Sequence, residues 1–176
     1  MMNINRSYNQ LVGLLSVICL IHNLEEWYLF KVKFSIIINA LPVGLKGSIG
    51  NDQHFLITLF GVAIVIATAI PFVVAIYIWN KPTILNAKIL LVAGLITLVN
   101  GISHISSSFM LGTVSPGFIT GVTLCIPSGI LIFEFFRRNF TITLRNYLLI
   151  CLLAIGIFIV GLVSIWGLAY LVISLF

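Results

Sequence analysis

Five long apolar segments constrain the fold of this chain more than any other feature of its sequence. Each has about 20 residues or more, the length that an α-helix needs to cross about 30 Å of hydrocarbon. Polar residues or proline and glycine separate them, and we expect them at Tyr8 to Phe30, Gln53 to Trp79, Asn86 to Leu111, Gly117 to Phe136 and Tyr147 to Leu175. Backbone polar groups in lipid must be satisfied within the protein, which favours helices. The sequence therefore predicts an all-α polytopic membrane bundle of about five transmembrane helices.

The composition supports this fold class. Of the 176 residues, 61% are hydrophobic and only 7% are charged, against roughly 25% charged residues in an average soluble domain. A water-soluble domain would need a polar shell, whereas the outer faces of helices in lipid can stay apolar. We expect residues 1–176 to form a single membrane-embedded helical domain whose main partner is the lipid bilayer.

The net charge of +5 does not indicate a nucleic-acid partner, because the basic residues are scattered in ones and twos near the ends of the apolar segments. With five spans, six of them fall on one side of the membrane and three on the other. The larger group is Arg6, Lys81, Lys88, Arg137, Arg138 and Arg145, and the smaller is Lys31, Lys33 and Lys46. Basic residues concentrate on the cytoplasmic side. We therefore expect a bacterial plasma membrane protein with a cytoplasmic amino terminus and an outward carboxyl terminus.

Several local features complete the expected architecture. The long linker from Lys31 to Asp52 is expected to lie on the membrane interface or dip into it, and Pro71 and Pro127 are expected to kink their helices. An odd, scattered set of three cysteines predicts packing residues and no disulfide framework. Small residues on helix faces favour close packing within the chain or an oligomer; these are Gly117 with Gly121, Ala63 with Ala67, and Gly156, Gly161 and Gly167.

The residues able to do chemistry are few, and antiparallel threading brings most of them to one end of the bundle. Six of the seven acidic residues and histidines fall there: His22, Glu25, Glu26, Asp52, His54 and His104. The remaining one, Glu134, lies at the other end beside Arg137 and Arg138, which indicates an interfacial ion pair. His54, at a helix start, is expected to be a solvated cap and not a ligand. This clustering follows from the helix count and does not depend on the orientation.

Helical geometry then predicts two polar faces. At about 100° per residue, Glu25 and Glu26 lie roughly 60° and 40° to either side of His22, and Cys19 shares that face. The third segment carries a polar stripe in an otherwise apolar helix, formed by Thr97, Asn100, His104, Ser107 and Ser108. If the two faces meet, they form a wet or metal-filled pocket.

Carboxylates near the hydrocarbon centre cost about 2.5–3.5 kcal/mol each on translocon scales, so something has to neutralise them. A divalent metal held by His22, His104 and Glu26 would do so, with zinc as the first expectation and iron as the second. Glu25 would then act as a general base for metal-bound water, and Asn100 would orient a ligand or the substrate. Alternatively, one glutamate keeps its proton and shares it with its neighbour or with His22.

Three motifs together resemble a known family. The segment His22-Asn23-Leu24-Glu25-Glu26 resembles the motif that names the HXXEE-domain family, membrane proteins of unknown function suspected to be enzymes. The family's Asn-Ala-x-x-His and Tyr-x-Pro-Gly signatures correspond to the segments 100–104 and 114–117, in the same order. Gly101 replaces alanine and Val114 replaces tyrosine. The resemblance implies a membrane protein and identifies no reaction.

Three functional hypotheses follow. The first is metal-assisted hydrolysis of a lipid-like or apolar substrate at the His22, Glu26 and His104 site, with Glu25 and Asn100 assisting. The second is a metal-free acid/base isomerase or cyclase that uses the paired glutamates. The third is a proton-coupled carrier or a non-catalytic membrane subunit, because buried ionisable residues also mark ion paths.

Overall fold

The computed structural model describes residues 4–40 and 52–175, and these form a helical bundle. Its elements are α1 (Ile4–Val32), α2 (Phe34–Ala40), α4 (Gln53–Ile78), α5 (Ile84–Leu111), α6 (Phe118–Thr120), the π-helix η1 (Gly121–Cys125), α7 (Ile126–Asn139) and α8 (Leu144–Ser174). Five helical stretches are long and apolar enough to cross a membrane, with α6, η1 and α7 together making the fourth. The predicted all-α integral membrane protein is confirmed. The observed helices extend a few residues beyond several of the predicted ends.

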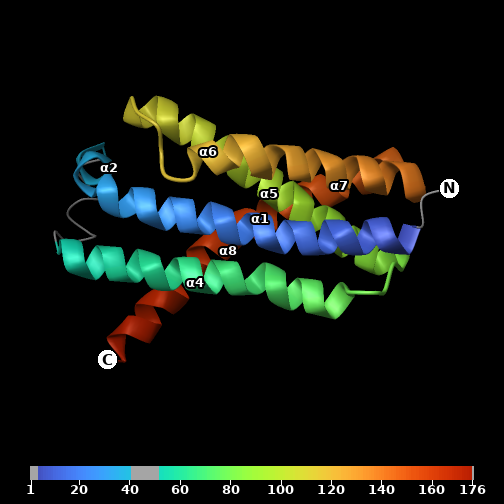
Figure 1. The fold of residues 1–176 in the computed structure, drawn as a ribbon, viewed down its shortest axis with the longest axis horizontal. Coiled ribbons are helices and arrows are strands. Elements are labelled where there is room, and N and C mark those ends of the chain that lie inside the picture. Colours follow the sequence, from blue (N-terminus) through green and yellow to red (C-terminus); the bar gives the residue numbers. More distant parts are fainter. Residues whose placement is uncertain (1–3, 41–51, 176) are drawn as a thin grey trace.

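Successive spans run antiparallel (Figure 1). The start of α1 and the α4–α5 connection lie at one end of the bundle, whereas α2 and the end of α8 lie at the other. The predicted linker begins as the short helix α2, and its remaining residues 41–51 lie outside the described part of the chain. The chemistry-bearing residues of α1 and α5 therefore share the end that carries α2.

Short polar side chains start three of the spans. Asp52, Thr83 and Thr143 each accept a hydrogen bond from the backbone amide three residues later, at 3.1, 3.3 and 3.4 Å. These bonds satisfy amides that have no partner within the helix. At the start of α4 the capping residue is thus Asp52 and not His54 as predicted, because only Asp52 precedes the helix with an acceptor for its free amide; His54 lies exposed in the first turn.

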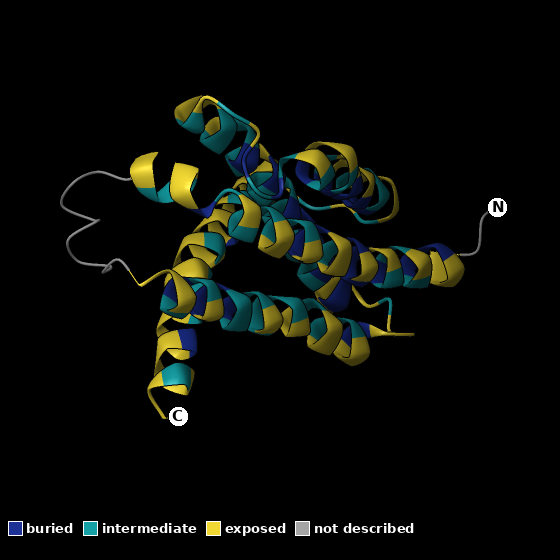
Figure 2. Cartoon of the chain, turned by 60° about the vertical axis from the view of Figure 1, so that its left-hand side comes forward, coloured by how far each residue is buried: buried dark blue, intermediate teal, exposed yellow. Residues whose placement is uncertain are grey.

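The core lies between α1, α5 and α7, with α4 and α8 packed around it. α5 and α7 approach closely because each carries a glycine that packs against a side chain of the other helix. A Cβ on Gly94 of α5 would lie 2.9 Å from Ile132, and one on Gly129 of α7 would lie 2.6 Å from Leu98. The helix α8 contacts the bundle through Ala169, which packs with Ala63 of α4. Figure 2 shows that most of the outer helix faces are exposed, as expected of surfaces that face lipid.

Polar contacts join α1 to α4 along their length. Asn23 donates to the Thr68 hydroxyl at 2.8 Å, and the Ser16 hydroxyl donates to the carbonyl of Pro71 at 3.2 Å. Such bonds replace the water that the membrane interior lacks. Pro71 lies within α4, as predicted, whereas Pro127 follows a π-turn and occupies the second position of α7.

Two further predictions are confirmed. Arg137 and Arg138 form ion pairs with Glu134 at 2.9 and 3.4 Å, and the three cysteines are free. Of the predicted small-residue faces, some pack inside the bundle and others do not. Gly121 packs against Gly101 inside the bundle, but Gly156, Gly161 and Gly167 of α8 have no atom within 4 Å of an added Cβ.

We predict that Gly129→Ala destabilises the bundle because the added methyl has to displace α5. Overpacking of this kind costs about 1–3 kcal/mol. Gly156→Ala is the matched control, since its methyl meets open space and alanine is the better helix former. The free energy of unfolding in detergent micelles, followed by tryptophan fluorescence, measures both. Equal stability of the two variants would contradict the observed packing of α5 on α7.

Candidate metal centre

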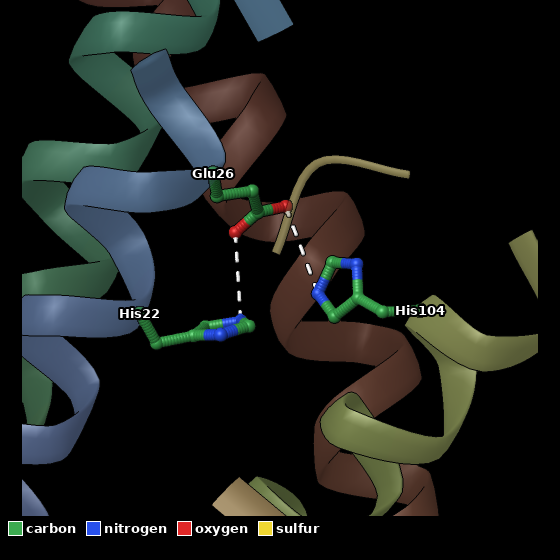
Figure 3. Close-up of side chains that lie close together, drawn as sticks. All are labelled: His22, Glu26 and His104. Carbon is green, nitrogen blue, oxygen red and sulfur yellow. Dashed lines mark ion pairs between the residues drawn. The ribbon is translucent and has the colours of Figure 1, made fainter. Parts of the chain in front are cut away.

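The predicted polar faces of α1 and α5 meet inside the bundle (Figure 3). His22 and His104 are buried, with 2% and 8% of their surfaces exposed, and their ring centroids lie 4.9 Å apart in an edge-on arrangement. The carboxylate of Glu26, one turn after His22, reaches between them. Its Oε2 lies 3.9 Å from His22 Nε2 and its Oε1 lies 4.0 Å from His104 Nε2.

The three side chains point their ligand atoms at a common volume. One nitrogen from each histidine and one Glu26 oxygen all lie within 4.8 Å of one another. In a tetrahedral zinc site with bonds of about 2.0–2.1 Å, neighbouring ligand atoms are about 3.3 Å apart. The observed separations of 3.9 and 4.0 Å exceed that spacing by about 0.6–0.7 Å, and the whole set of ligand atoms spans up to 4.8 Å, so the side chains would move inward to hold an ion.

His104 brings an unsatisfied polar atom to this volume. Its ring lies close to the backbone of Pro116, which has only a carbonyl to offer, so a protonated ring nitrogen on that side would donate to it. Its Nε2 is buried and has no hydrogen-bond partner among the described residues. An unsatisfied buried polar atom costs about 1–3 kcal/mol and calls for an explanation such as a bound ion.

His22, in contrast, is held at both ring nitrogens. The Asn100 side-chain nitrogen lies 2.9 Å from Nε2, and the Thr120 hydroxyl lies 2.9 Å from Nδ1. An amide nitrogen can only donate, so Nε2 accepts and Nδ1 carries the proton that Thr120 accepts. Asn100 therefore orients His22, which was one of the two roles expected for it.

Glu25 points to a different partner. Its two carboxylate oxygens accept hydrogen bonds from the backbone amides of Ile119 at 3.1 Å and Thr120 at 2.7 Å. These amides begin the fourth span, where a negative charge is favourable. Glu25 is thus not one of the converging residues, and its predicted role as a general base stays a prediction.

The turn between α5 and α6 covers the two histidines. Ser115 and Ser108 both donate to the carbonyl of His104, each at 2.8 Å, and their hydroxyls lie 3.0 Å apart. Gly117 has a φ of +78°, and a Cβ there would lie 2.8 Å from both imidazole rings. Only glycine satisfies both the conformation and the contact.

Some predicted residues lie away from the cluster. Ser107 donates to the carbonyl of Ser103 within its own helix, and Thr97 contacts Cys19 at 4.0 Å, one turn deeper in the bundle. Conversely, no pattern in the sequence singles out Thr120, Ser115 or the contact of Gly117 with the rings. A Ser-Pro-Gly turn shortly after a histidine-bearing helix was the available signal for the last two.

Two buried histidines and a glutamate inside five spans define a polytopic helical membrane protein with a candidate metal centre. The chain belongs to the family described as proteins of unknown function with an HXXEE motif, whose model matches residues 13–132. The matched range contains all three signatures. No curated protein and no solved structure matches the chain.

The structure gives a reason for one departure from the family signatures. A Cβ on Gly101 would lie 2.7 Å from the carbonyl oxygen of Gly121. Glycine in place of alanine lets α5 approach the π-helix η1 closely at the level of the cluster. Val114, in place of tyrosine, is 40% exposed, and its carbonyl accepts a hydrogen bond from Lys33.

We predict that Gly117→Ala is more damaging than Gly112→Ala. Both positions have positive φ, so each substitution carries a conformational cost of about 1–2 kcal/mol. Only the methyl at position 117 also meets the two imidazoles, because nothing lies within 4 Å at position 112. The difference in unfolding free energy between the two variants measures that contact. Equal losses would show that Gly117 does not press on the histidines.

Proposed function

We propose that this protein is a membrane-embedded, metal-dependent enzyme that holds one divalent cation, zinc before iron, between His22, Glu26 and His104. The observation that carries the proposal is the buried, unpartnered Nε2 of His104, 4.0 Å from a glutamate and on the same small volume as a second imidazole. Two histidines and one carboxylate are the protein ligands of catalytic sites that keep a position open.

The charge of Glu26 supports the same conclusion. Its side chain is only 21% exposed, and the two imidazoles are the basic groups that the described residues place within 4.0 Å of it. A carboxylate inside the membrane normally pairs with a cation or faces a polar cavity. A divalent ion at this point neutralises the carboxylate and gives His104 Nε2 a partner at once.

The reaction we propose is hydrolysis of a lipid-like or apolar substrate. A bound ion would polarise the substrate and activate water at neutral pH. His104 lies seven residues before the end of α5, about 10 Å along the helix axis, so a substrate has to enter apolar surroundings. Glu26 faces the accessible side, His22 is held rigidly, and Glu25 is engaged by backbone amides.

We predict that the purified protein binds about one zinc ion per chain and that His22→Ala, His104→Ala and Glu26→Gln each reduce this content to near zero. His54→Ala is the matched control, because His54 is exposed and lies outside the cluster. Elemental analysis after dialysis against zinc-containing and then metal-free buffer gives the content. A wild-type protein that retains no metal would overturn the proposal.

A second candidate uses the same residues without a metal. It is favoured by the hydrogen bond from Asn100 to His22 Nε2, because this bond occupies the lone pair that an ion needs. Glu26 and the histidines would then exchange a proton with an apolar substrate in an isomerisation or cyclisation. Turnover of membrane lipids that survives strong chelation but is lost in Glu26→Gln would favour this candidate over the first.

A carrier or a non-catalytic subunit is the third candidate, and the distribution of ionisable groups argues against a carrier. The described cluster lies at one end of the bundle, and Glu134 at the other end is already paired with arginines. A carrier needs polar groups along its path. Proton-coupled flux into liposomes that depends on Glu26 would revive it.

The proposed setting is a bacterial plasma membrane with the cluster nearer the outer leaflet. The end of the bundle that carries Arg6 has six basic residues in the sequence, against three at the end near the cluster, which favours a cytoplasmic amino terminus. A reporter enzyme that is active only outside the cytoplasm, fused after residue 176, is expected to be active. Activity of the same reporter in the α4–α5 connection instead would reverse the orientation.

A further inference from the structure

Thr120 contacts two residues of α1 that lie about one helical turn apart, His22 and Glu25. Its hydroxyl lies 2.9 Å from His22 Nδ1, and its backbone amide donates to Glu25 at 2.7 Å. His22 and Glu25 are three residues apart, so they lie on neighbouring positions of the same helix face. One residue of the fourth span therefore contacts two members of the HXXEE motif, through its side chain and its backbone respectively.

We propose that Thr120 is a positioning residue for His22, whose Nδ1 proton it accepts while Asn100 donates to Nε2, and that Glu25 acts through Thr120 by holding its backbone in place. A neutral imidazole has one proton and two nitrogens, and the hydrogen bond at one nitrogen decides which one carries it. With the proton on Nδ1, shared with Thr120, Nε2 carries no proton: it accepts from Asn100 and lies 3.9 Å from the Glu26 carboxylate. The opposite tautomer would present a proton to the cluster.

The backbone around Thr120 is held from both sides. Gly117 lies against the rings of His22 and His104 on one side, and the π-helix η1 begins at Gly121 on the other. π-turns occur mostly as single insertions in helices and often at functional sites. Glu25 accepts the amides of both Ile119 and Thr120, so the start of the fourth span cannot turn without losing two hydrogen bonds to a carboxylate.

In this arrangement the two adjacent glutamates of the motif have different roles. Glu26 faces the histidines, and Glu25 secures the residue that orients one of them. Partners that orient a histidine ligand from outside the coordination sphere typically contribute 10–100-fold to metal affinity. The inference rests on the proposed function where it concerns metal affinity, but the tautomer of His22 can be measured without any metal.

The first test is nitrogen NMR of the metal-free, full-length protein labelled with ¹⁵N-histidine, with His22 assigned by the loss of its signals in His22→Ala. We expect His22 to be protonated at Nδ1 and unprotonated at Nε2. Thr120→Val, which keeps the shape, removes the acceptor of the Nδ1 proton, so the share of the Nδ1-protonated tautomer should fall although Asn100 still donates to Nε2, and Thr120→Ser should keep the wild-type share. A wild-type His22 protonated at Nε2 would overturn the inference without any variant at position 120.

The second test measures zinc affinity by competition with a chromophoric chelator. Thr120→Val is expected to bind zinc 10–100-fold more weakly and Thr120→Ser within a few-fold of the wild type. Glu25→Gln, which loses the charge but not the shape, is expected to fall between them. Thr123→Val is the matched control, because Thr123 is exposed and donates only to the carbonyl of Ile119.

The outcomes separate the two proposals. A wild-type protein that binds no zinc but shows the expected tautomer, with a lower share in Thr120→Val, defeats the metal proposal and leaves the role of Thr120 standing. Zinc binding that is unchanged in Thr120→Val, together with an unchanged tautomer, defeats the role of Thr120 and leaves the metal proposal standing. Thr120→Ala replaces Thr120→Val if the latter does not fold.

Discussion

The structure depends on one constraint of the membrane interior: polar groups that enter it have to be satisfied by protein. The second half of α1 carries His22, Glu25 and Glu26, and no lipid can accept them. Their polar partners come from α5, which contributes Asn100 and His104, and from the start of the fourth span, which contributes two backbone amides and the Thr120 hydroxyl. The packing of α1 between these elements follows from this need more than from apolar contacts, which lipid tails can replace.

The same constraint explains why the fourth span is irregular. A span that began as a regular helix would present its first amides without partners inside or near the membrane. Glu25 supplies the missing acceptor, while Gly117 allows the chain to turn directly against the imidazoles with a φ of +78°. The π-helix η1 then follows before the regular helix α7. A single short region thus ends a turn, caps a helix and positions a histidine.

The sequence was sufficient for the fold and for the core of the candidate site. Five spans follow from segment length alone, and helical periodicity placed His22 and Glu26 on one polar stripe and His104 on another, which the structure brings together. It was not sufficient for Thr120, because the contact with His22 depends on where the chain re-enters the bundle after Gly112, which no local pattern encodes. It also overstated Ser107, since a serine hydroxyl in a helix can donate to a carbonyl one turn earlier.

The choice between a metal site and a metal-free site depends on Asn100. The free energies of the hydrogen bond lost and of the metal bonds gained favour the metal. An ion at the cluster would displace the hydrogen bond from Asn100 to His22 Nε2, at a net cost of about 0.5–1.5 kcal/mol. In return, the partly buried Glu26 carboxylate would be neutralised and the unpartnered His104 Nε2 would be satisfied, and structural zinc sites contribute on the order of 10 kcal/mol at neutral pH. The freed Asn100 amide would then be available to donate to a substrate oxygen. The hydrogen bond that occupies His22 Nε2 is therefore too weak to exclude a metal.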